Sequence, residues 1–526
     1  MEGPPMTASV TTPVQEIWME NRVSALKEKV RLLFEDSKDI IEQMNLVDTI
    51  QHLGIGHHFK KQIANTLCNI QHMEFNTSSL HKVSLRFRLL REHGLRVSPD
   101  EFNRFMDTNG SFNMEMTNDP RGLLSLYNAA YMFIHDEALE EAISFARLHL
   151  ESMRHNLEYP LSEQVNRALH IPLPRTVRRV ETLPYMSEYK HEREYNPIIL
   201  ELAKIDFNNL QQLHKKEIEA ISKWWKNLHA EVALSFARNR IVQLYLWSYA
   251  VYYEHEYSCA RIILTKLLAV ITMMDDIYDT RATLEESQKL NEAIKRWDES
   301  AVSILPEYLK KFYLRILRTF KEIQDMQAPN EQYKVSYAQK SFQTLSNYYL
   351  QGAEWFHCKK TPTFKEKVEV SLMDSGGPFS CVALLVGMGD IASKEALDWA
   401  LGYTGAVRAC GEIARYMNDI AALKHICYPQ HGNREQDAAN SVECYIAEYN
   451  ATSEVAIANI NRMVEDAWKT ANKDMLELGS LRPAVKRVID VTASLTLMYG
   501  DKKDAFTFGD DLESLIKRLF FTPITI

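Results

Sequence analysis

The chain has 526 residues, of which 46% are hydrophobic and 25% charged, and its formal net charge at pH 7 is −9. This composition is that of a globular protein long enough for more than one domain, and it excludes an intrinsically disordered chain. The acidic balance argues against general nucleic-acid binding.

Residues 1–13 have neither an apolar secretory core nor the arginine- and serine-rich pattern of a transit peptide. No stretch of about 18 uncharged apolar residues is present, so the sequence predicts no membrane span. The seven cysteines include no CxxC pair, which indicates reduced thiols rather than a disulfide framework or a zinc site. We therefore expect a cytoplasmic protein, and we expect it to be a monomer.

Helical periodicity recurs through most of the chain, whereas strand-like alternation is nearly absent. This pattern predicts an all-α protein whose helices pack as antiparallel neighbours. Five prolines and a charged run lie within residues 160–197 and mark a domain boundary. We predict an N-terminal helical domain at 21–205 and a C-terminal domain at 206–526, with an atypical, disordered segment at 1–20.

Two arginines precede an aromatic-rich helix in the second half of the chain. Arg238 and Arg240 are one residue apart, and guanidinium groups are preferred partners of phosphate oxygens. Such a pair is more often a solvated surface feature. The aromatic stripe that includes Tyr245 and Trp247 is more often core, although an aromatic face can also stabilise a cation. The residues alone leave both interpretations open.

Three aspartates follow the most apolar stretch of the chain. Residues 262–271 are apolar on almost every face and predict a buried helix, and Asp275, Asp276 and Asp279 come next. Asp275 and Asp279 share one helix face, where burying two unpaired like charges is costly. Magnesium removes that cost, because it is usually held by carboxylates together with substrate phosphates. The alternative is a solvated acidic helix end.

A second polar group lies downstream, where Arg415 precedes Asn418 and Asp419 by one helical turn. The amide and the carboxylate are oxygen donors suited to a second metal site. An Asn-Asp pair by itself carries little information, since many helix interiors and caps contain one.

Taken together, these residues resemble the plant class I terpene synthases, most closely the sesquiterpene synthases found in grasses. The resemblance covers almost the whole chain, and the order and spacing of its marks make it specific. The marks are Leu46 to Ile50, Leu53 to Phe59, Asp206-Phe207, Trp224-Trp225, Arg238-Asn-Arg240, Asp275 to Asp279, Thr283 to Glu286, Gly387-Met-Gly389, Arg415 to Asp419, Val442 to Tyr445, Met498 to Gly500 and Phe521 to Ile526.

The resemblance implies two α-helical domains, an N-terminal α-barrel-like one and a C-terminal class I terpenoid synthase bundle that holds the active site. It implies three Mg²⁺ ions, with Mn²⁺ as a substitute, that bind and ionise a prenyl diphosphate. The implied metal ligands are Asp275, Asp279 and Asn418, of which the two aspartates are also catalytic and bind substrate, while Asp276 is more peripheral. The implied diphosphate ligands are Arg238, Arg240 and Arg415.

The family pattern Tyr-x₄-Asp-x-Tyr near the C-terminus reads Tyr499, Asp504 and Phe506 in this chain. The resemblance implies catalytic roles for Tyr499 and Asp504. Phe506 retains the aromatic face and lacks the hydroxyl, so stabilisation of a cation survives and proton transfer through that hydroxyl does not. Trp247 matches the tryptophan on the floor of the family's cavity, where it and Phe506 would face the substrate.

The second metal motif departs from the family pattern (N/D)Dxx(S/T/G)xxxE. Its middle position is Ala422 and its last is Ile426, and neither side chain binds a metal. Pro429 predicts an early end to the helix. Glu435, Asp437 or a water molecule would therefore have to replace the missing metal ligand. The chain also lacks the family's usual N-terminal start, which helps to cap the active site. A shortened cap would admit water to the cavity, and water that quenches the cation would favour an alcohol product.

Two functions follow from these observations. The first is a sesquiterpene synthase that ionises farnesyl diphosphate and cyclises or rearranges the cation to a hydrocarbon or an alcohol. The second is a catalytically weak or inactive homologue that binds prenyl diphosphates through a degenerate second motif. A chain-elongating prenyltransferase would need a second DDxxD motif, which the sequence lacks. A purely structural helical protein leaves Arg238, Asp275 and Arg415 in family register unexplained.

Overall fold

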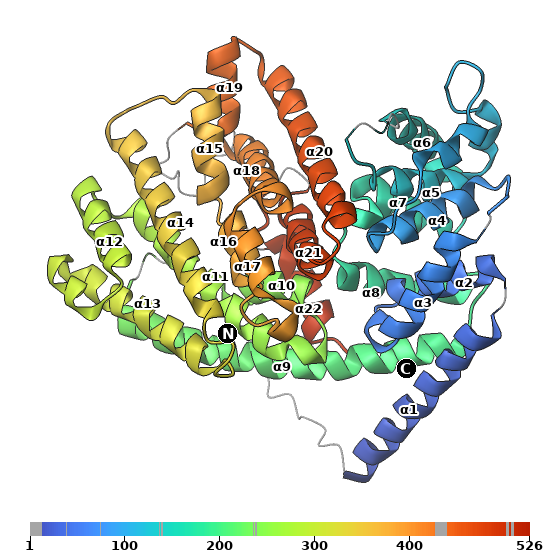
Figure 1. The fold of residues 1–526 in the computed structure, drawn as a ribbon, viewed down its shortest axis with the longest axis horizontal. Coiled ribbons are helices and arrows are strands. Elements are labelled where there is room, and N and C mark those ends of the chain that lie inside the picture. The colour runs from blue at the N-terminus through green and yellow to red at the C-terminus, as the bar shows by residue number, and fades with distance from the viewer. Residues whose placement is uncertain are drawn as a thin grey trace.

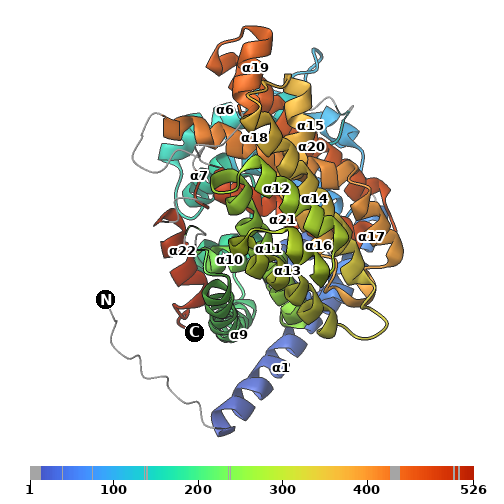
Figure 2. The same cartoon turned by 90° about the vertical axis from the view of Figure 1, so that its left-hand side faces the viewer.

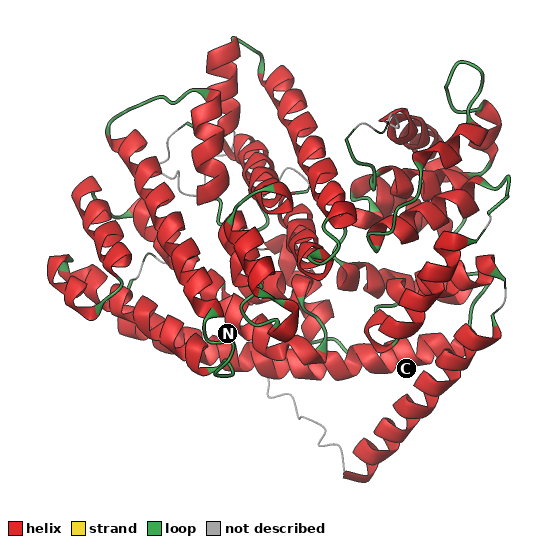
Figure 3. Ribbon diagram, in the orientation of Figure 1, coloured by secondary structure: helices red, strands yellow, loops and turns green. Residues whose placement is uncertain are grey.

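The computed structural model describes residues 13–37, 39–73, 75–135, 137, 140–234, 236, 239–426, 439–500, 504–506 and 510–526. Within these ranges every regular element is a helix and no β-strand is present (Figure 3). One isolated β-bridge joins Met106 and Phe112. The all-α prediction is confirmed.

Most of the helices form two groups above one long helix, α9 (Pro197–Val232), which runs beneath both, while α1 extends below it (Figure 1). The N-terminal group contains α1 (Pro13–Asp36), α2 (Ile40–His52), α3 (Lys60–His72), α4 (Leu80–Glu92), α5 (Pro120–Ala130), α6 (Glu140–Met153), α7 (Leu161–His170) and α8 (Arg178–Glu188). The C-terminal group contains α10 (Ile241–Val251), α11 (Ser258–Thr280), α12 (Leu284–Arg296), α13 (Glu307–Asp325), α14 (Lys334–His357), α15 (Phe364–Asp374), α16 (Gly377–Ala383), α17 (Lys394–Leu401), α18 (Gly405–Ile426), α19 (Ser441–Tyr449), α20 (Ser453–Glu477), α21 (Arg482–Tyr499) and α22 (Asp510–Phe520).

Short 3₁₀ helices connect several of these elements. They are η1 (Gly56–His58), η2 (Pro99–Phe105), η3 (Met114–Asn118), η4 (Arg154–Asn156), η5 (Leu173–Arg175), η6 (Tyr189–His191), η7 (His255–Tyr257), η8 (Glu299–Ile304) and η9 (Gly389–Ile391).

Helix α9 belongs to both groups. It starts where the Asn196 side chain accepts a hydrogen bond of 2.9 Å from the Ile198 N–H, with Pro197 in the first turn. The boundary predicted between residues 205 and 206 falls inside this helix. Helix α1 begins at Pro13, so residues 13–20 of the segment expected to be disordered are helical, and residues 1–12 lie outside the described residues.

Direct contacts join the two groups of helices. The Arg175 guanidinium donates two hydrogen bonds, of 2.7 and 2.6 Å, to the Glu465 carboxylate of α20. The Asn472 amide donates to the backbone carbonyls of Tyr131 and Phe133, both at 3.0 Å. Two-pronged arginine–carboxylate pairs add geometric specificity as well as energy. These bonds hold α20 of the C-terminal group against the N-terminal group.

The C-terminal tail returns to α9. Helix α22 lies beside α9 (Figure 2). The Asn208 amide donates to the Ile524 carbonyl at 2.8 Å, and its side-chain oxygen accepts from the Ile524 N–H at 2.8 Å. This reciprocal pair ties the last residues of the chain to the helix that underlies the C-terminal bundle.

A buried ion pair fixes the two helices that carry much of the candidate site. Arg261 on α11 is 0% exposed and donates to both oxygens of Glu217 on α9, at 2.6 and 2.7 Å. The Tyr245 hydroxyl on α10 donates to the same carboxylate at 2.7 Å. Removing one member of such a buried pair would leave an uncompensated charge. The network therefore sets the positions of α10 and α11 relative to α9.

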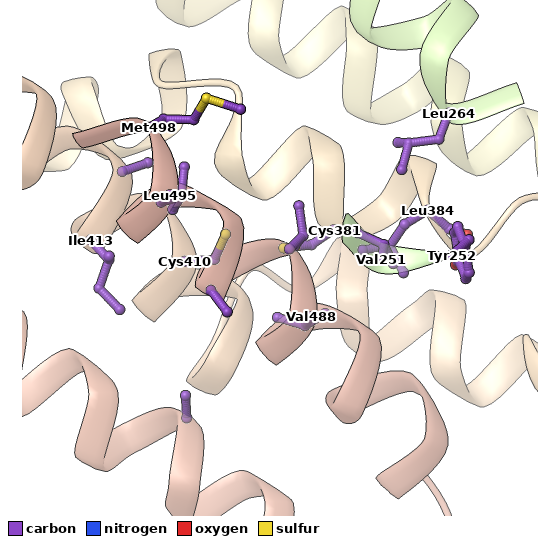
Figure 4. Packing of buried hydrophobic residues seen from close by; sticks show 14 of the residues in the cluster. Val251, Tyr252, Leu264, Cys381, Leu384, Cys410, Ile413, Val488, Leu495 and Met498 are labelled. Carbon is purple, nitrogen blue, oxygen red and sulfur yellow. The ribbon is translucent and has the colours of Figure 1, made fainter. Parts of the chain in front are cut away.

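An apolar core packs between α16, α18 and α21. Figure 4 shows Cys381 of α16, Cys410 of α18 and Leu495 of α21 within one cluster of buried side chains. A core of this kind is close-packed, which holds the surrounding helices in a defined arrangement.

The stretch His255–Thr280 is long and apolar enough to cross a membrane by length and composition alone. However, 67% of its most apolar window is buried inside the structure. The core helix of a globular protein meets the same criteria, and α11 is such a helix. It is no clear membrane span.

Candidate active site

A cavity of about 980 Å³, partly open to solvent, lies between the helices of the C-terminal group. It combines an apolar wall with charged side chains. Its lining residues are Arg240, Trp247, Leu268, Ile271, Thr272, Asp275, Tyr349, Asp374, Ser375, Gly376, Gly377, Ser380, Cys410, Ala414, Arg415, Asn418, Val491, Leu495, Tyr499, Asp504 and Phe506.

Most of the predicted site residues meet in this cavity. Those that line it are Arg240, Trp247, Asp275, Arg415, Asn418, Tyr499, Asp504 and Phe506. Asp279 is not a lining residue, but it is close enough to Asp275 and Tyr349 to act on the Tyr349 hydroxyl. Arg238, Pro429, Glu435 and Asp437 lie outside the described residues, as does the side chain of Ile426.

Side chains from two distant parts of the sequence, residues 240–247 and residue 506, form an aromatic and cationic stack in the cavity wall. The rings of Trp247 and Phe506 are stacked, with centroids 4.5 Å apart. The Arg240 guanidinium lies over the Phe506 ring, 4.4 Å from its centroid. Within the described residues the Trp247 indole N–H has no hydrogen-bond acceptor. The stack holds residues 504–506 against the start of α10 and presents aromatic faces that favour a cation.

The aspartates of α11 point in different directions, as helical geometry requires. Asp275 lines the cavity, whereas Asp276 is 3% exposed, does not line it and is packed inside the protein. Tyr349 of α14 hydrogen-bonds to Asp275, and its burial, with the charges of Asp275 and Asp279, raises the pKa of its hydroxyl well above the usual value. Nothing in the sequence around Tyr349 singled it out.

Arg415 organises the polar part of α18. Its Nη2 donates to the Asp419 carboxylate at 2.6 Å and also contacts the Asn418 side-chain oxygen. The other oxygen of Asp419 accepts a hydrogen bond of 2.8 Å from the Ser441 N–H at the start of α19. Asp419 is thus occupied in holding Arg415 and α19, whereas Asn418 lines the cavity.

The structure adds a carboxyl group that the sequence analysis missed. Asp374 is the last residue of α15 and lines the cavity just before a helix break, where Gly376 has a φ of +74° that favours glycine. Burial, with the nearby charges of Asp275 and Asp419, raises the pKa of its carboxyl to about 7. The signal in the sequence was an acidic residue in an apolar stretch, separated by Ser375 from Gly-Gly-Pro at residues 376–378.

The donor atoms around the cavity suit a divalent metal ion. The carboxylates of Asp275, Asp279 and Asp374 all raise the pKa of the same hydroxyl, that of Tyr349. They therefore gather in one buried region. Hard oxygen donors in this number are the ligands that Mg²⁺ takes, so the residues fit the metal that the resemblance implied.

The second motif keeps its helix and its first ligand but not the ligand at position 422. Helix α18 extends to Ile426, so positions 418, 422 and 426 share one face by helical geometry. Ala422 contributes only a methyl group to that face. Of the two described side chains at these three positions, Asn418 alone has an oxygen to offer.

Two family profiles match the chain. "Terpene synthase, N-terminal domain" matches residues 6–169. "Terpene synthase family, metal binding domain" matches residues 226–470, which include Asp275, Asp279 and Asn418.

Similar full-length proteins come from plants. The chain is 48% identical over 522 residues to tau-cadinol synthase of Zea mays, covering 98% of this chain and 94% of that protein. It is 46% identical over 523 residues to alpha-copaene synthase of Zea mays, covering 96% of each. Among solved structures it resembles isoprene synthase from grey poplar leaves, with a TM-score of 0.88, 29% identity and 99% of each chain covered. That enzyme in complex with three Mg²⁺ ions and dimethylallyl-S-thiolodiphosphate superposes with a TM-score of 0.86 at 28% identity, over 97% of this chain and 98% of that one.

Proposed function

This chain belongs to the terpene synthase family, and on that premise we propose that it is a sesquiterpene synthase acting on farnesyl diphosphate. The observation that carries the proposal is one cavity in which the Asp275 carboxylate of α11, the guanidinium groups of Arg240 and Arg415, and the ring faces of Trp247 and Phe506 meet. Two relatives that share nearly half of its residues are named for sesquiterpene products. Identity over the whole chain favours a working enzyme over a binder without turnover.

The metal-binding residues that we propose are Asp275 and Asp279 on α11 and Asn418 on α18. The chain's family profile is that of a metal-binding domain. We propose three Mg²⁺ ions, as in the isoprene synthase complex, with Mn²⁺ able to replace them. When bound, such ions neutralise the charge that grows on the departing diphosphate.

The protein's own residues then position the diphosphate and shelter the cation. Arg415, with Arg240, offers planar sets of N–H donors that match phosphate oxygens. Trp247 and Phe506 present ring faces to the allylic cation, and the apolar wall excludes the water that would quench it. Because position 506 has no hydroxyl, we propose that the oxygens of Asp504 and Tyr499, which line the same cavity, accept the final proton.

The test of this function is a product assay on the purified full chain with farnesyl diphosphate and Mg²⁺. We expect diphosphate release matched by a volatile sesquiterpene, identified by gas chromatography and mass spectrometry, and loss of both with a chelator. Geranyl diphosphate serves as the comparison substrate. Tight binding of farnesyl diphosphate without release would favour the inactive binder instead.

We further propose a monomer in a reducing compartment such as the cytoplasm. The six described cysteines are all free thiols, and three of them are buried. Thiols in this state are typical of compartments that keep disulfides reduced.

Trp247→Ala is expected to change the products more than the rate of diphosphate release. Without the ring, the cation loses about 0.5–2 kcal/mol of stabilisation, so acyclic or water-quenched products should increase while release falls by about 30-fold at most. Trp225→Ala is the matched control, because Trp225 is a buried tryptophan of α9 that does not line the cavity. It should lower the melting temperature and leave the product profile unchanged. A destabilised Trp247→Ala enzyme with the original products would show that Trp247 is only core.

A further inference from the structure

Asp374 occupies the cavity without a bonding partner that explains its burial. Its side chain is 16% exposed, and within the described residues no group donates a hydrogen bond to it. Two cations, Lys367 and Arg415, act on this carboxyl group. The Arg415 Nη1 lies 3.9 Å from Asp374 Oδ1, beyond hydrogen-bond distance. A buried carboxyl group without such a partner is costly, so its position calls for a ligand.

The neighbours of Asp374 place it between the two metal-binding helices. Arg415 contacts Asn418 through Nη2 and faces Asp374 through Nη1, so both side chains lie beside one guanidinium group. Asp374 also acts on the Tyr349 hydroxyl, as Asp275 of α11 does. Its Oδ2 would lie 3.8 Å from a β-carbon at Gly352 of α14. The carboxyl group is therefore close to ligands from both α11 and α18.

Arg415 does not need Asp374 as a counter-ion. Its Nη2 already donates to Asp419 at 2.6 Å, in the stronger geometry. The second metal site, in contrast, lacks an oxygen donor. Ala422 and Ile426 occupy the positions at which the family pattern has its other two metal ligands.

We propose that Asp374, at the break between α15 and α16, supplies the carboxylate ligand that the second metal site of this chain lacks. A ligand from this break replaces one from α18 because the two elements face the same cavity. The inference rests on the proposed function, since the site holds the metal ions that bind diphosphate.

The experiment measures Mg²⁺ binding in the presence of inorganic pyrophosphate, by calorimetry and by the rise in melting temperature. It uses the full chain without farnesyl diphosphate, so a failure of the proposed substrate would not affect it. Asp374→Asn retains the shape and removes the charge. Asp390→Asn is the matched control, because Asp390 is exposed and lies outside the cavity.

We expect Asp374→Asn to raise the Mg²⁺ concentration for half-saturation by about tenfold or more, since even residues that only support metal ligands change affinity by about 10–100-fold. Asp390→Asn should leave it unchanged. Adding Ala422→Ser and Ile426→Glu to Asp374→Asn restores the family motif and should return the value to near that of the original chain. This rescue distinguishes a lost ligand from a general disturbance of the cavity.

Two results would overturn the inference. One is an Asp374→Asn protein that binds Mg²⁺ and pyrophosphate like the original chain, even if its terpene products change, because Asp374 would then act on the carbocation. The other is weakened binding that the restored motif does not rescue although the variant keeps its melting temperature, because Asp374 would then serve the cavity in another way.

Discussion

Asp275→Asn is expected to reduce turnover of farnesyl diphosphate by about 10²–10³-fold or more, the scale on which loss of one stabilising group slows charge-developing reactions. Asp275 lines the cavity and hydrogen-bonds with Tyr349. Asparagine keeps the size and one oxygen but removes the charge that holds a divalent ion. Steady-state release of diphosphate, measured at saturating Mg²⁺, checks this result.

The neighbouring aspartate is the control for that experiment. Asp276 differs from Asp275 by one helical step of about 100° and is packed inside the protein, away from the cavity lining. Asp276→Asn should therefore reduce turnover less than Asp275→Asn does. Any reduction in its turnover should be accompanied by a lower melting temperature. Equal turnover in the two variants would refute the assignment of Asp275 as a metal ligand.

Arg415→Lys is expected to weaken the binding of pyrophosphate and to reduce turnover by about 10²-fold. Lysine keeps the charge but has no planar fork of N–H donors, so it cannot hold Asp419 and a phosphate oxygen in the same way. The measurements are the inhibition constant of pyrophosphate and the KM and kcat for farnesyl diphosphate.

Arg408→Lys, two turns earlier on the same helix, is the matched control. Arg408 pairs with Glu369 at 2.6 and 3.0 Å on the exposed side of α18, and it does not line the cavity. Surface pairs of this kind contribute little, so this variant should bind pyrophosphate normally. If both variants lose binding to the same extent, Arg415 acts through helix stability and not through contact with the diphosphate.

The fold class and the first metal motif were predictable because their signals are local. Helical periodicity, the buried stretch before Asp275, and the spacing of Asp275 and Asp279 can all be read within one or two helical turns. The domain boundary was harder. Helix α9 continues through residues 205 and 206, and the two family profiles leave residues 170–225 unassigned. A shared helix carries no local mark of where one domain ends, so the boundary remains a prediction.

The candidate site was only partly accessible to the same reasoning. Trp247 and Phe506 were each proposed from a family pattern, but their stacking with Arg240 depends on residues 504–506 returning to the start of α10. The degenerate second motif was visible in the sequence at Ala422. A replacement ligand was sought only a few residues downstream, because a sequence search favours neighbours along the chain.

The sequence by itself determined the residue types, the helices and the chemistry of the first metal motif, since each depends on contacts within a few turns of one helix. Tertiary structure decided that Asp374 and Tyr349 join that site. Asp374 reaches the cavity because α15 ends at a break with Gly376 at positive φ. It lies near the first metal motif because α14 packs against both α11 and α15, and α15 packs against α18. Such positions are set by the close packing of helices far apart in the chain, which no local pattern encodes.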